Sequence, residues 1–403
     1  MGRHVEVCVR PLRREDLAGT HGILRHPEVM RQTLQLPSLQ VGWMSGWLAD
    51  PQSRISLVAE LVHPTGHTGQ EARHAVVGMI SLRRMTGRQQ HVAGLGMSVH
   101  PAFHGRGIGT TLMGAALDAA DREWQVVRTQ LAVYPDNEPA LRLYRRFGFR
   151  EEGRLARVAI RDGTYVDTVV MARIRPDLAT CDDVREEGTA DRPPIAHGRG
   201  TGHLPGRRDT APGEAGWDAA VSDAEGLEVR PPEPADAGGL VRLYRDPGLI
   251  RNSLLVPDPP PDEKEIAEKL GIPPAAPVHV FVAVFRGELC GEVRLAPQRS
   301  PRMAHSAQVT LLVPPPGSPL AQDLGFPARP VARALLAAAL DLADRWLLLY
   351  RLRLDTYPDE EWLFPVLQGL GFVVEARDRM AAARDGRYDD RLVWGRLRPE
   401  PQA

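Results

Sequence analysis

Residues 95–112, LGMSVHPAFHGRGIGTTL, decide how this chain folds. The apolar run ends at a proline, glycines follow at the alternate positions Gly105, Gly107 and Gly109, and a helix is predicted from Thr110 onward. Glycines at this spacing let backbone N–H groups converge, because no Cβ blocks positive φ. The unpaired amides and positive end of the next helix face the same point. The stretch therefore predicts a phosphate or pyrophosphate site, with a plain tight turn as the alternative.

A second stretch follows about 30 positions later, at residues 134–149, YPDNEPALRLYRRFGF. The first stretch fails the P-loop pattern, since no Gly-Lys-Ser/Thr follows it, and no ribose-binding acid completes a dinucleotide fingerprint. The order and separation of the two stretches carry more information than either alone.

Together these stretches resemble the GNAT acetyltransferases. The family's pyrophosphate loop reads Gln/Arg-x-x-Gly-x-Gly/Ala, and HGRGIG at residues 104–109 matches it except at His104. The family's second motif, Asn-x-x-Ala-x-x-x-Tyr-x-x-x-Gly-Phe, is matched at Asn137, Ala140, Tyr144, Gly148 and Phe149.

The resemblance implies acetyl-CoA as the cofactor, gripped by the glycine loop through its pyrophosphate. The pantetheine arm would pair with the exposed backbone of the preceding strand as an added strand, and Asn137 would hydrogen-bond the same arm. The implied cofactor-binding residues are Met97, Ser98, Val99, His104, Gly105, Arg106, Gly107, Ile108, Gly109, Thr110, Asn137 and Tyr144.

Tyr144 is the implied catalytic residue, placing its hydroxyl near the sulfur as general acid for the leaving thiolate. A helix tyrosine that only packs the core is the alternative. The general base stays open, because HVAGLGM at residues 91–97 has no carboxylate; His91, a water chain or an amine that is already partly neutral are the options. An amide of the same strand would serve the oxyanion.

Within the family, residues 5–175 resemble bacterial members that acetylate free L-amino acids, so a small-molecule amine is the implied acceptor. We expect residues 33–47 to form a lid over it with the substrate-binding residues Gln35, Trp43 and Trp47, or both tryptophans to be core. Protein or peptide N-acetylation, at an N-terminus or a lysine, is the alternative enzyme activity. A non-catalytic acyl-CoA-binding or scaffold protein is the alternative of another class.

Composition bounds the remaining functions. A chain of 403 residues favours two domains, and a net charge of -1 gives no basic field to attract nucleic acid or a membrane surface. Cys8, Cys181 and Cys290 lie far apart, so no cysteine zinc site is predicted and a reducing compartment is indicated. The sequence has no signal-peptide core and no apolar run of the ~20 residues that a membrane span needs. We therefore expect a soluble cytoplasmic bacterial protein without metal.

The N-terminal pattern recurs in the second half of the chain. Val9-Arg10-Pro11 returns as Val229-Arg230-Pro231, Ala116–Trp124 as Ala339–Trp346, Tyr134-Pro-Asp as Tyr357-Pro-Asp, and Arg161-Asp-Gly as Arg384-Asp-Gly. Arg230 lies 220 positions after Arg10 and Arg384 lies 223 after Arg161, a register that chance would not keep. The chain is predicted to be a tandem repeat: a catalytic domain at residues 5–177, a flexible linker at 178–226 that is poor in periodic apolar residues, and a second domain at 227–398.

The second copy is predicted to be degenerate. Residues 313–336, VPPPGSPLAQDLGFPARPVARALL, replace the glycine loop, and prolines lack the amide donors that a phosphate needs. Glu360 stands at the Asn137 position and Leu367 at the Tyr144 position. The expected fold class is α/β (α+β), two tandem GNAT folds, each a mixed, centrally splayed sheet flanked by helices. Pairing with the first domain, or shaping its substrate site, is the expected role of the second.

Overall fold

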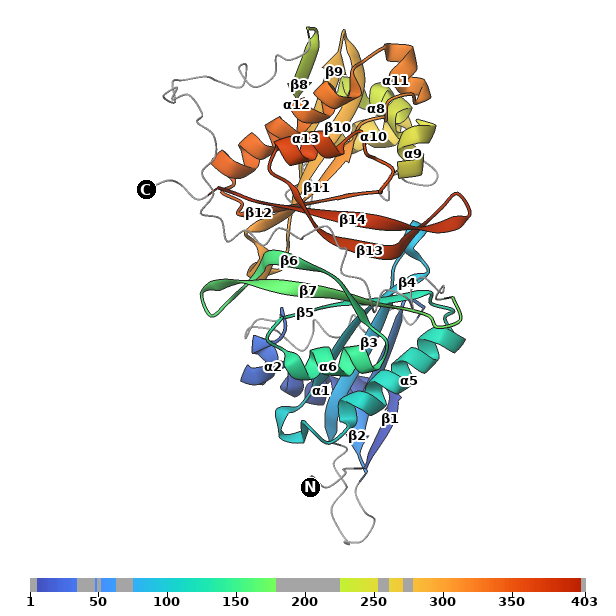
Figure 1. Ribbon diagram of the computed structural model, residues 1–403, viewed down its shortest axis with the longest axis vertical. Coiled ribbons are helices and arrows are strands. Elements are labelled where there is room, and N and C mark those ends of the chain that lie inside the picture. Colours follow the sequence, from blue (N-terminus) through green and yellow to red (C-terminus); the bar gives the residue numbers. More distant parts are fainter. Residues whose placement is uncertain are drawn as a thin grey trace, which may run out of the picture. The chain divides into compact units, whose positions relative to one another are not determined.

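The computed structural model describes residues 6–34, 48, 52–62, 75–178, 225–252, 261–270 and 278–399 (Figure 1). The chain forms two compact units. Unit 1 comprises Met1–Glu186 with Ser300–Met303 and Ala376–Asp390, and unit 2 comprises Glu187–Arg299, Ala304–Glu375 and Arg391–Ala403. The predicted linker, residues 178–226, lies almost entirely outside the described residues.

Unit 1 begins with a strand and two short helices and continues as a mixed sheet. Its elements from the first half of the chain are β1 (Val7–Pro11), η1 (Arg14–Asp16), α1 (Leu17–Arg25), α2 (Pro27–Arg31), β2 (Arg54–Leu61), β3 (Val76–Arg84), η2 (Gly87–Gln89), β4 (Val92–Val99), η3 (Pro101–Phe103), α5 (Ile108–Arg122), β5 (Arg128–Val133), α6 (Glu138–Arg146), β6 (Arg150–Arg161) and β7 (Thr164–Ile174). Helix α5 begins at Ile108, two residues before the start predicted at Thr110.

The sheet of unit 1 has the order β1-β2-β3-β4-β5-β7-β6, and its single parallel pair among these strands is β4 with β5. That pair is short: Val92, Ala93 and Gly94 register with the first three residues of β5, and the ladder stops there. Beyond Gly94 the two strands separate, which confirms the predicted central splay.

Helices cover both faces of this sheet. On one face, α5 and α6 pack an apolar core of buried residues that includes Ile80, Leu112 and Leu131. On the other face, α1 and α2 pack a smaller cluster that includes Ile23 and Met79. Burying these apolar side chains supplies the main stabilisation of the unit, at roughly 25 cal/mol per Å² of apolar surface removed from water.

Unit 2 repeats the element order. Its elements are β8 (Leu227–Arg230), η5 (Pro234–Asp236), α8 (Ala237–Tyr244), α9 (Pro247–Asn252), α10 (Glu263–Leu270), β9 (His279–Phe285), β10 (Glu288–Pro297), β11 (Ser306–Leu312), α11 (Pro319–Leu324), α12 (Ala328–Asp341), η7 (Leu342–Trp346), β12 (Arg351–Thr356), α13 (Phe364–Gly369) and parts of β13 (Val373–Arg384) and β14 (Arg387–Leu397); η6 (Pro301–Met303) belongs to unit 1. Strands β11 and β12 are again a short parallel pair, Ser306–Gln308 with Arg351–Arg353.

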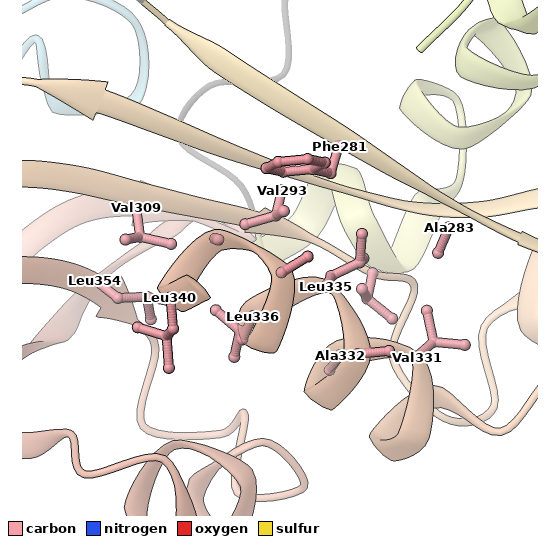
Figure 2. Close-up of a cluster of buried hydrophobic side chains, with 14 of the residues drawn as sticks. Phe281, Ala283, Val293, Val309, Val331, Ala332, Leu335, Leu336, Leu340 and Leu354 are labelled. Carbon is pink, nitrogen blue, oxygen red and sulfur yellow. The ribbon is translucent and has the colours of Figure 1, made fainter. Parts of the chain in front are cut away.

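The core of unit 2 lies between its sheet and α12. Figure 2 shows Leu335, Leu336 and Leu340 of this helix among side chains of the strands, including Phe281 and Val309. The packing is close enough to require a glycine in each unit at the same place. A Cβ on Gly291 would lie 2.9 Å from a Leu335 methyl carbon, and one on Gly78 would lie 3.0 Å from Leu112. The two glycines lie on β3 and β10, the third strand of the sheet in each unit, and so occupy corresponding positions.

Candidate active site

The predicted pyrophosphate loop is an exposed turn between η3 and α5. Gly105 and Gly107 have φ of +72° and +83°, and a Cβ built on either would meet no heavy atom within 4 Å. Glycine is therefore required here by backbone conformation rather than by crowding. Gly107 is the N-cap of α5, and the first helical bond runs from the Thr111 N–H to the Gly107 carbonyl, 3.0 Å.

The amides of Ile108, Gly109 and Thr110 lie in the first turn of α5, where no acceptor exists within the helix. They point out of the positive end of a helix of 15 residues, beside glycines that expose their own backbone. The residues present thus fit an anionic group such as a pyrophosphate. Gly109 differs from the other two glycines, because a Cβ there would lie 3.2 Å from Leu143, so it serves close packing of α5 against α6.

His104 ties the loop to the end of β4. Its Nε2 lies 2.8 Å from the Val99 carbonyl oxygen, so one ring nitrogen is used in holding the turn. Arg106 places its guanidinium carbon 5.2 Å from the centre of the Phe103 ring. Both side chains are exposed and border the loop, which is where a predicted cofactor-binding role would place them.

The strand that leads into the loop has an edge open to a ligand. Met97, Ser98 and Val99 pair with β3 on one side, through Ile80, Met79 and Gly78. On the other side the ladder to β5 has already ended at Gly94. The backbone of residues 97–99 therefore faces the splay between β4 and β5, in the position that an added strand would need.

Asn137 marks the start of α6 at the carboxyl end of β5. Its Oδ1 accepts from the Ala140 N–H at 3.3 Å and so caps the helix. Pro139 is tolerated because the first helical turn has no partner for its missing N–H. Gly148, with φ of +82°, follows the end of the helix in the left-handed conformation that favours glycine.

Tyr144 lies on α6 with its ring in the core shared by α5 and the sheet. Its side chain is buried, 8% exposed, and its ring centre is 5.8 Å from that of Phe149. Burial raises the pKa of the Tyr144 hydroxyl to about 12. The phenol therefore keeps its proton throughout the neutral range, as a proton donor must. Packing in the core does not prevent Tyr144 from acting as a general acid, because the ring makes the packing contacts while the hydroxyl keeps its proton.

His91, one option for the general base, is held inside unit 1. Its Nε2 lies 2.9 Å from the Met380 carbonyl oxygen and its ring centre 4.3 Å from that of Tyr388. Burial lowers the pKa of His91, so the ring is neutral at pH 7, but only 7% of the residue is exposed. This geometry fixes His91 in packing rather than offering it to an amine.

Three predicted acceptor-site residues, Gln35, Trp43 and Trp47, lie outside the described residues. Sequence reasoning gave no role to Tyr134, Arg161 or Arg302, which the structure brings together within unit 1. The recurrence of Tyr134 as Tyr357 was a signal for the tyrosine, but no local pattern marks Arg302. Among the described residues there is no group of three or more His, Cys, Asp or Glu side chains that could hold a metal, and no helix long and apolar enough to cross a bilayer.

A glycine loop at a helix N-terminus, a splayed parallel strand pair beside it and a buried tyrosine on the next helix are together the features expected of an N-acyltransferase fold. The chain belongs to the GNAT acetyltransferase family, whose model, described as Acetyltransferase (GNAT) family, matches residues 32–149.

Two curated relatives each align with about two fifths of the chain. The L-amino acid N-acetyltransferase AaaT of Escherichia coli (strain K12) is 31% identical over 170 residues, 42% of this chain and 99% of that protein. The spermidine N(1)-acetyltransferase of the same strain is 25% identical over 171 residues, 41% of this chain and 84% of that protein. The first unit is thus an N-acetyltransferase domain, and these relatives leave the second half of the chain unmatched.

Solved structures align with a similar share of the chain. The spermidine N-acetyltransferase from Vibrio cholerae in complex with CoA and spermine has a TM-score of 0.36 and 23% identity, covering 42% of this chain and 95% of that one. A GCN5-related N-acetyltransferase from Kribbella flavida has a TM-score of 0.36 and 25% identity, covering 42% and 98%.

Proposed function

We propose that the protein moves the acetyl group of acetyl-CoA to the primary amine of a small molecule, with free L-amino acids as the acceptor class, by direct attack in a ternary complex. The observation that carries the proposal is the exposed turn at Gly105 and Gly107, whose positive φ angles turn backbone amides toward one point in front of α5. The 31% identity to an L-amino acid N-acetyltransferase over 99% of its length supports the choice of acceptor.

Acetyl-CoA, when bound, supplies an activated thioester carbonyl for attack by the amine. In this proposal the amides of residues 105–110 hold the pyrophosphate, because those of Ile108, Gly109 and Thr110 have no partner within the helix and lie at its positive end, and the turn before them is exposed. The backbone of residues 97–99 holds the extended arm along β4, and an amide of this strand faces the carbonyl oxygen where negative charge develops.

Asn137 and Tyr144 complete the site from α6. Asn137 stands at the carboxyl end of β5 with its amide group at the mouth of the splay, where it can donate to the arm while its oxygen caps the helix. Tyr144, seven residues or about two helical turns further on, would donate a proton to the leaving thiolate. A positioned acid of this kind contributes typically 10²–10⁴-fold to rate.

The same proposal assigns catalysis to residues 5–177 and makes residues 227–398 a degenerate repeat without a cofactor. In unit 2 the place of the glycine loop is taken by α11, whose first turn is already capped. The Ser318 hydroxyl accepts from the Ala321 N–H at 3.2 Å, and the buried Asp246 carboxylate accepts from the Leu320 N–H at 3.0 Å. Amides that are satisfied in this way, beside a carboxylate, do not bind phosphate.

A panel of amines with acetyl-CoA, followed by release of free thiol, tests the acceptor class. The panel contains the twenty L-amino acids, spermidine and a short peptide with a free N-terminus and one lysine. We expect turnover with a subset of the amino acids at least tenfold above the other amines, and none with the Gly107→Val variant. Faster turnover with spermidine or the peptide would overturn the proposed acceptor, and no turnover with any amine would favour a binding or scaffold role.

A further inference from the structure

The face of unit 1 that carries α1 and α2 holds an arginine from far along the sequence. Arg302 lies in η6, which belongs to unit 1 and packs beside β6. Its Nη1 donates to the carbonyl oxygens of Met30 and Thr33, at 3.1 and 3.0 Å. This guanidinium therefore lies at the carboxyl end of α2.

Tyr134 lies at the same place, directly after β5. Leu131 and Val133 face the core under α5 and α6. Because side chains alternate along a strand, Tyr134 belongs to the opposite face of the sheet. Its side chain is buried, 4% exposed, and the Arg161 guanidinium carbon lies 4.8 Å from its ring centre. Burial raises the pKa of the Tyr134 hydroxyl, and the positive charge and hydrogen bonding of Arg302 oppose that rise. The hydroxyl is thus a neutral group beside the Arg302 guanidinium.

The arginines around Tyr134 differ in whether a carboxylate balances their charge. Arg161 is neutralised by Asp136 through two hydrogen bonds of 3.0 and 2.8 Å, and Arg31 lies 3.1 Å from Asp162. Arg302 instead donates to backbone carbonyls, and within the described residues no carboxylate forms an ion pair with it. Its two hydrogen bonds to backbone carbonyls both use Nη1, and a guanidinium has five N–H donors. A partly enclosed cation with donors to spare matches a carboxylate ligand.

We propose that Arg302 binds the α-carboxylate of the acceptor amino acid, with the Tyr134 hydroxyl as a second donor, and so turns the acceptor amine toward the splay between β4 and β5. This assignment rests on the proposed function and names the residue that would select amino acids over other amines. Tyr134 follows β5, one strand of the splay, so a carboxylate held beside it places an amine two bonds away at the mouth of the splay. The second half of the sequence then supplies a substrate-binding residue to the first unit.

The test compares a carboxylate acceptor with its amide. The acceptors are the L-amino acid with the highest kcat/KM in the panel above and the carboxamide of the same amino acid, both assayed with the full-length protein. Arg302→Gln should lower kcat/KM for the amino acid by about 10- to 100-fold, as expected for a lost charge-assisted hydrogen bond. It should change kcat/KM for the amide less than threefold and leave the KM for acetyl-CoA unchanged. Arg302→Lys should retain part of the preference for the carboxylate.

Two further variants separate recognition from folding. Arg299→Gln changes an exposed arginine three positions earlier and should leave both acceptors unaffected. Tyr134→Phe keeps the bonds of Arg302 to α2 and should lower the acid-to-amide ratio of kcat/KM by about threefold or more. Equal losses for acid and amide in Arg302→Gln, or unchanged ratios in both Arg302→Gln and Tyr134→Phe, would overturn the assignment while acetylation itself stands. Absence of amino-acid turnover in the unmodified protein would instead overturn the proposed function.

Discussion

Unit 1 and unit 2 share the charges that hold their sheets together but differ at the loop that would hold a cofactor. Arg128 pairs with Glu152 in unit 1 at 2.6 Å, and Arg351 pairs with Glu375 in unit 2. Arg173–Asp121 and Arg396–Asp344 form a second matched set, each at 2.7 Å. All four residues of unit 2 lie 223 positions after their counterparts, so the two units carry these ion pairs at corresponding positions.

The two units differ in the segment that joins the fourth strand of the sheet, β4 or β11, to its long helix, α5 or α12. In unit 1, β4 is followed by the turn at Gly105 and Gly107, and α5 begins directly after that turn. In unit 2 the chain makes the extra helix α11, and α12 begins after Pro327 with a second proline, Pro330, in its first turn. The two units therefore share the ion pairs of their sheets and differ at the loop whose backbone amides would bind a ligand.

The α6 position shows the same division between fold and site. Asn137 caps α6, whereas Glu360 accepts from the Tyr357 N–H at 2.7 Å in a turn, and α13 begins only at Phe364. Leu367, at the Tyr144 position, is fully buried in the apolar core of unit 2. Packing is preserved by the leucine, but the proton donor is absent.

The largest effect is expected from Tyr144→Phe, which should reduce kcat by about 10²–10⁴-fold with little change in acetyl-CoA affinity. The ring keeps its packing and only the proton is lost. Because burial raises the pKa of Tyr144 to about 12, the unmodified enzyme should show no loss from this group between pH 6 and 9. The deficit of the variant should shrink as the pH falls, because solvent then protonates the thiolate. Tyr165→Phe, an exposed tyrosine of unit 1, is the control; unchanged turnover in Tyr144→Phe would make Tyr144 structural.

Breaking the shared ion pairs should affect both units alike. Glu152→Gln removes the nearer of two carboxylates from Arg128, which is fully buried and also lies 3.9 Å from Asp378. Glu375→Gln removes the paired carboxylate from Arg351. Each should lower the free energy of unfolding of its unit by about 3–5 kcal/mol. Hydrogen exchange of the β5 amides and of the β12 amides reports the two units separately. Asp118→Asn, in an exposed pair with Arg122, should cost less than about 0.5 kcal/mol. A large loss in only one unit would contradict a framework common to both.

A smaller difference is expected at the helix caps. Asn137→Ala should weaken acetyl-CoA binding about tenfold, through a lost hydrogen bond and a frayed α6. Glu360→Ala in unit 2 should leave the dissociation constant unchanged, because no cofactor is expected there. Isothermal titration of both variants checks this, and equal weakening in the two would speak against a single site.

The smallest effect is expected in acid. In both units the first strand carries an arginine that pairs with an aspartate of the following turn, Arg10 with Asp16 and Arg230 with Asp236, each at 2.7 Å. The pKa of Asp16 is lowered, because hydrogen bonds from Arg10 and Arg13 outweigh its burial, and the pKa of Asp236 is lowered mainly by its hydrogen bond with Arg230. A carboxyl group whose pKa is lower in the folded state stabilises the fold at pH values above its unfolded pKa, which is near 3.9. This stabilisation is lost as the pH falls below that value.

Urea titrations should therefore show that the free energy of unfolding of both units falls between pH 6 and 3. Asp16→Asn should make this fall smaller in unit 1, and Asp236→Asn should make it smaller in unit 2. A pH-independent midpoint would show that these aspartates do not contribute.

The sequence predicted the local parts of the molecule and missed those that depend on distant contacts. Gly105, Gly107 and the Asp162-Gly163 turn have positive φ, a requirement that residue type alone reveals. Helix α11 was missed, because its prolines indicated a loop, although Ser318 and Pro319 are typical first residues of a helix. Arg302 could not be predicted, since it is brought to α2 across about 270 positions by tertiary folding and no local pattern encodes that contact.

The stoichiometry of acetyl-CoA binding to the full-length chain shows whether the protein has one cofactor site or one in each unit. Isothermal titration should give one site per chain. Gly107→Val should weaken binding by at least 10²-fold, because a β-branched residue does not adopt φ near +83°. Gly317→Val, at φ of +88° in the corresponding region of unit 2, should leave binding unchanged. Two sites per chain, or full affinity in Gly107→Val, would contradict the account.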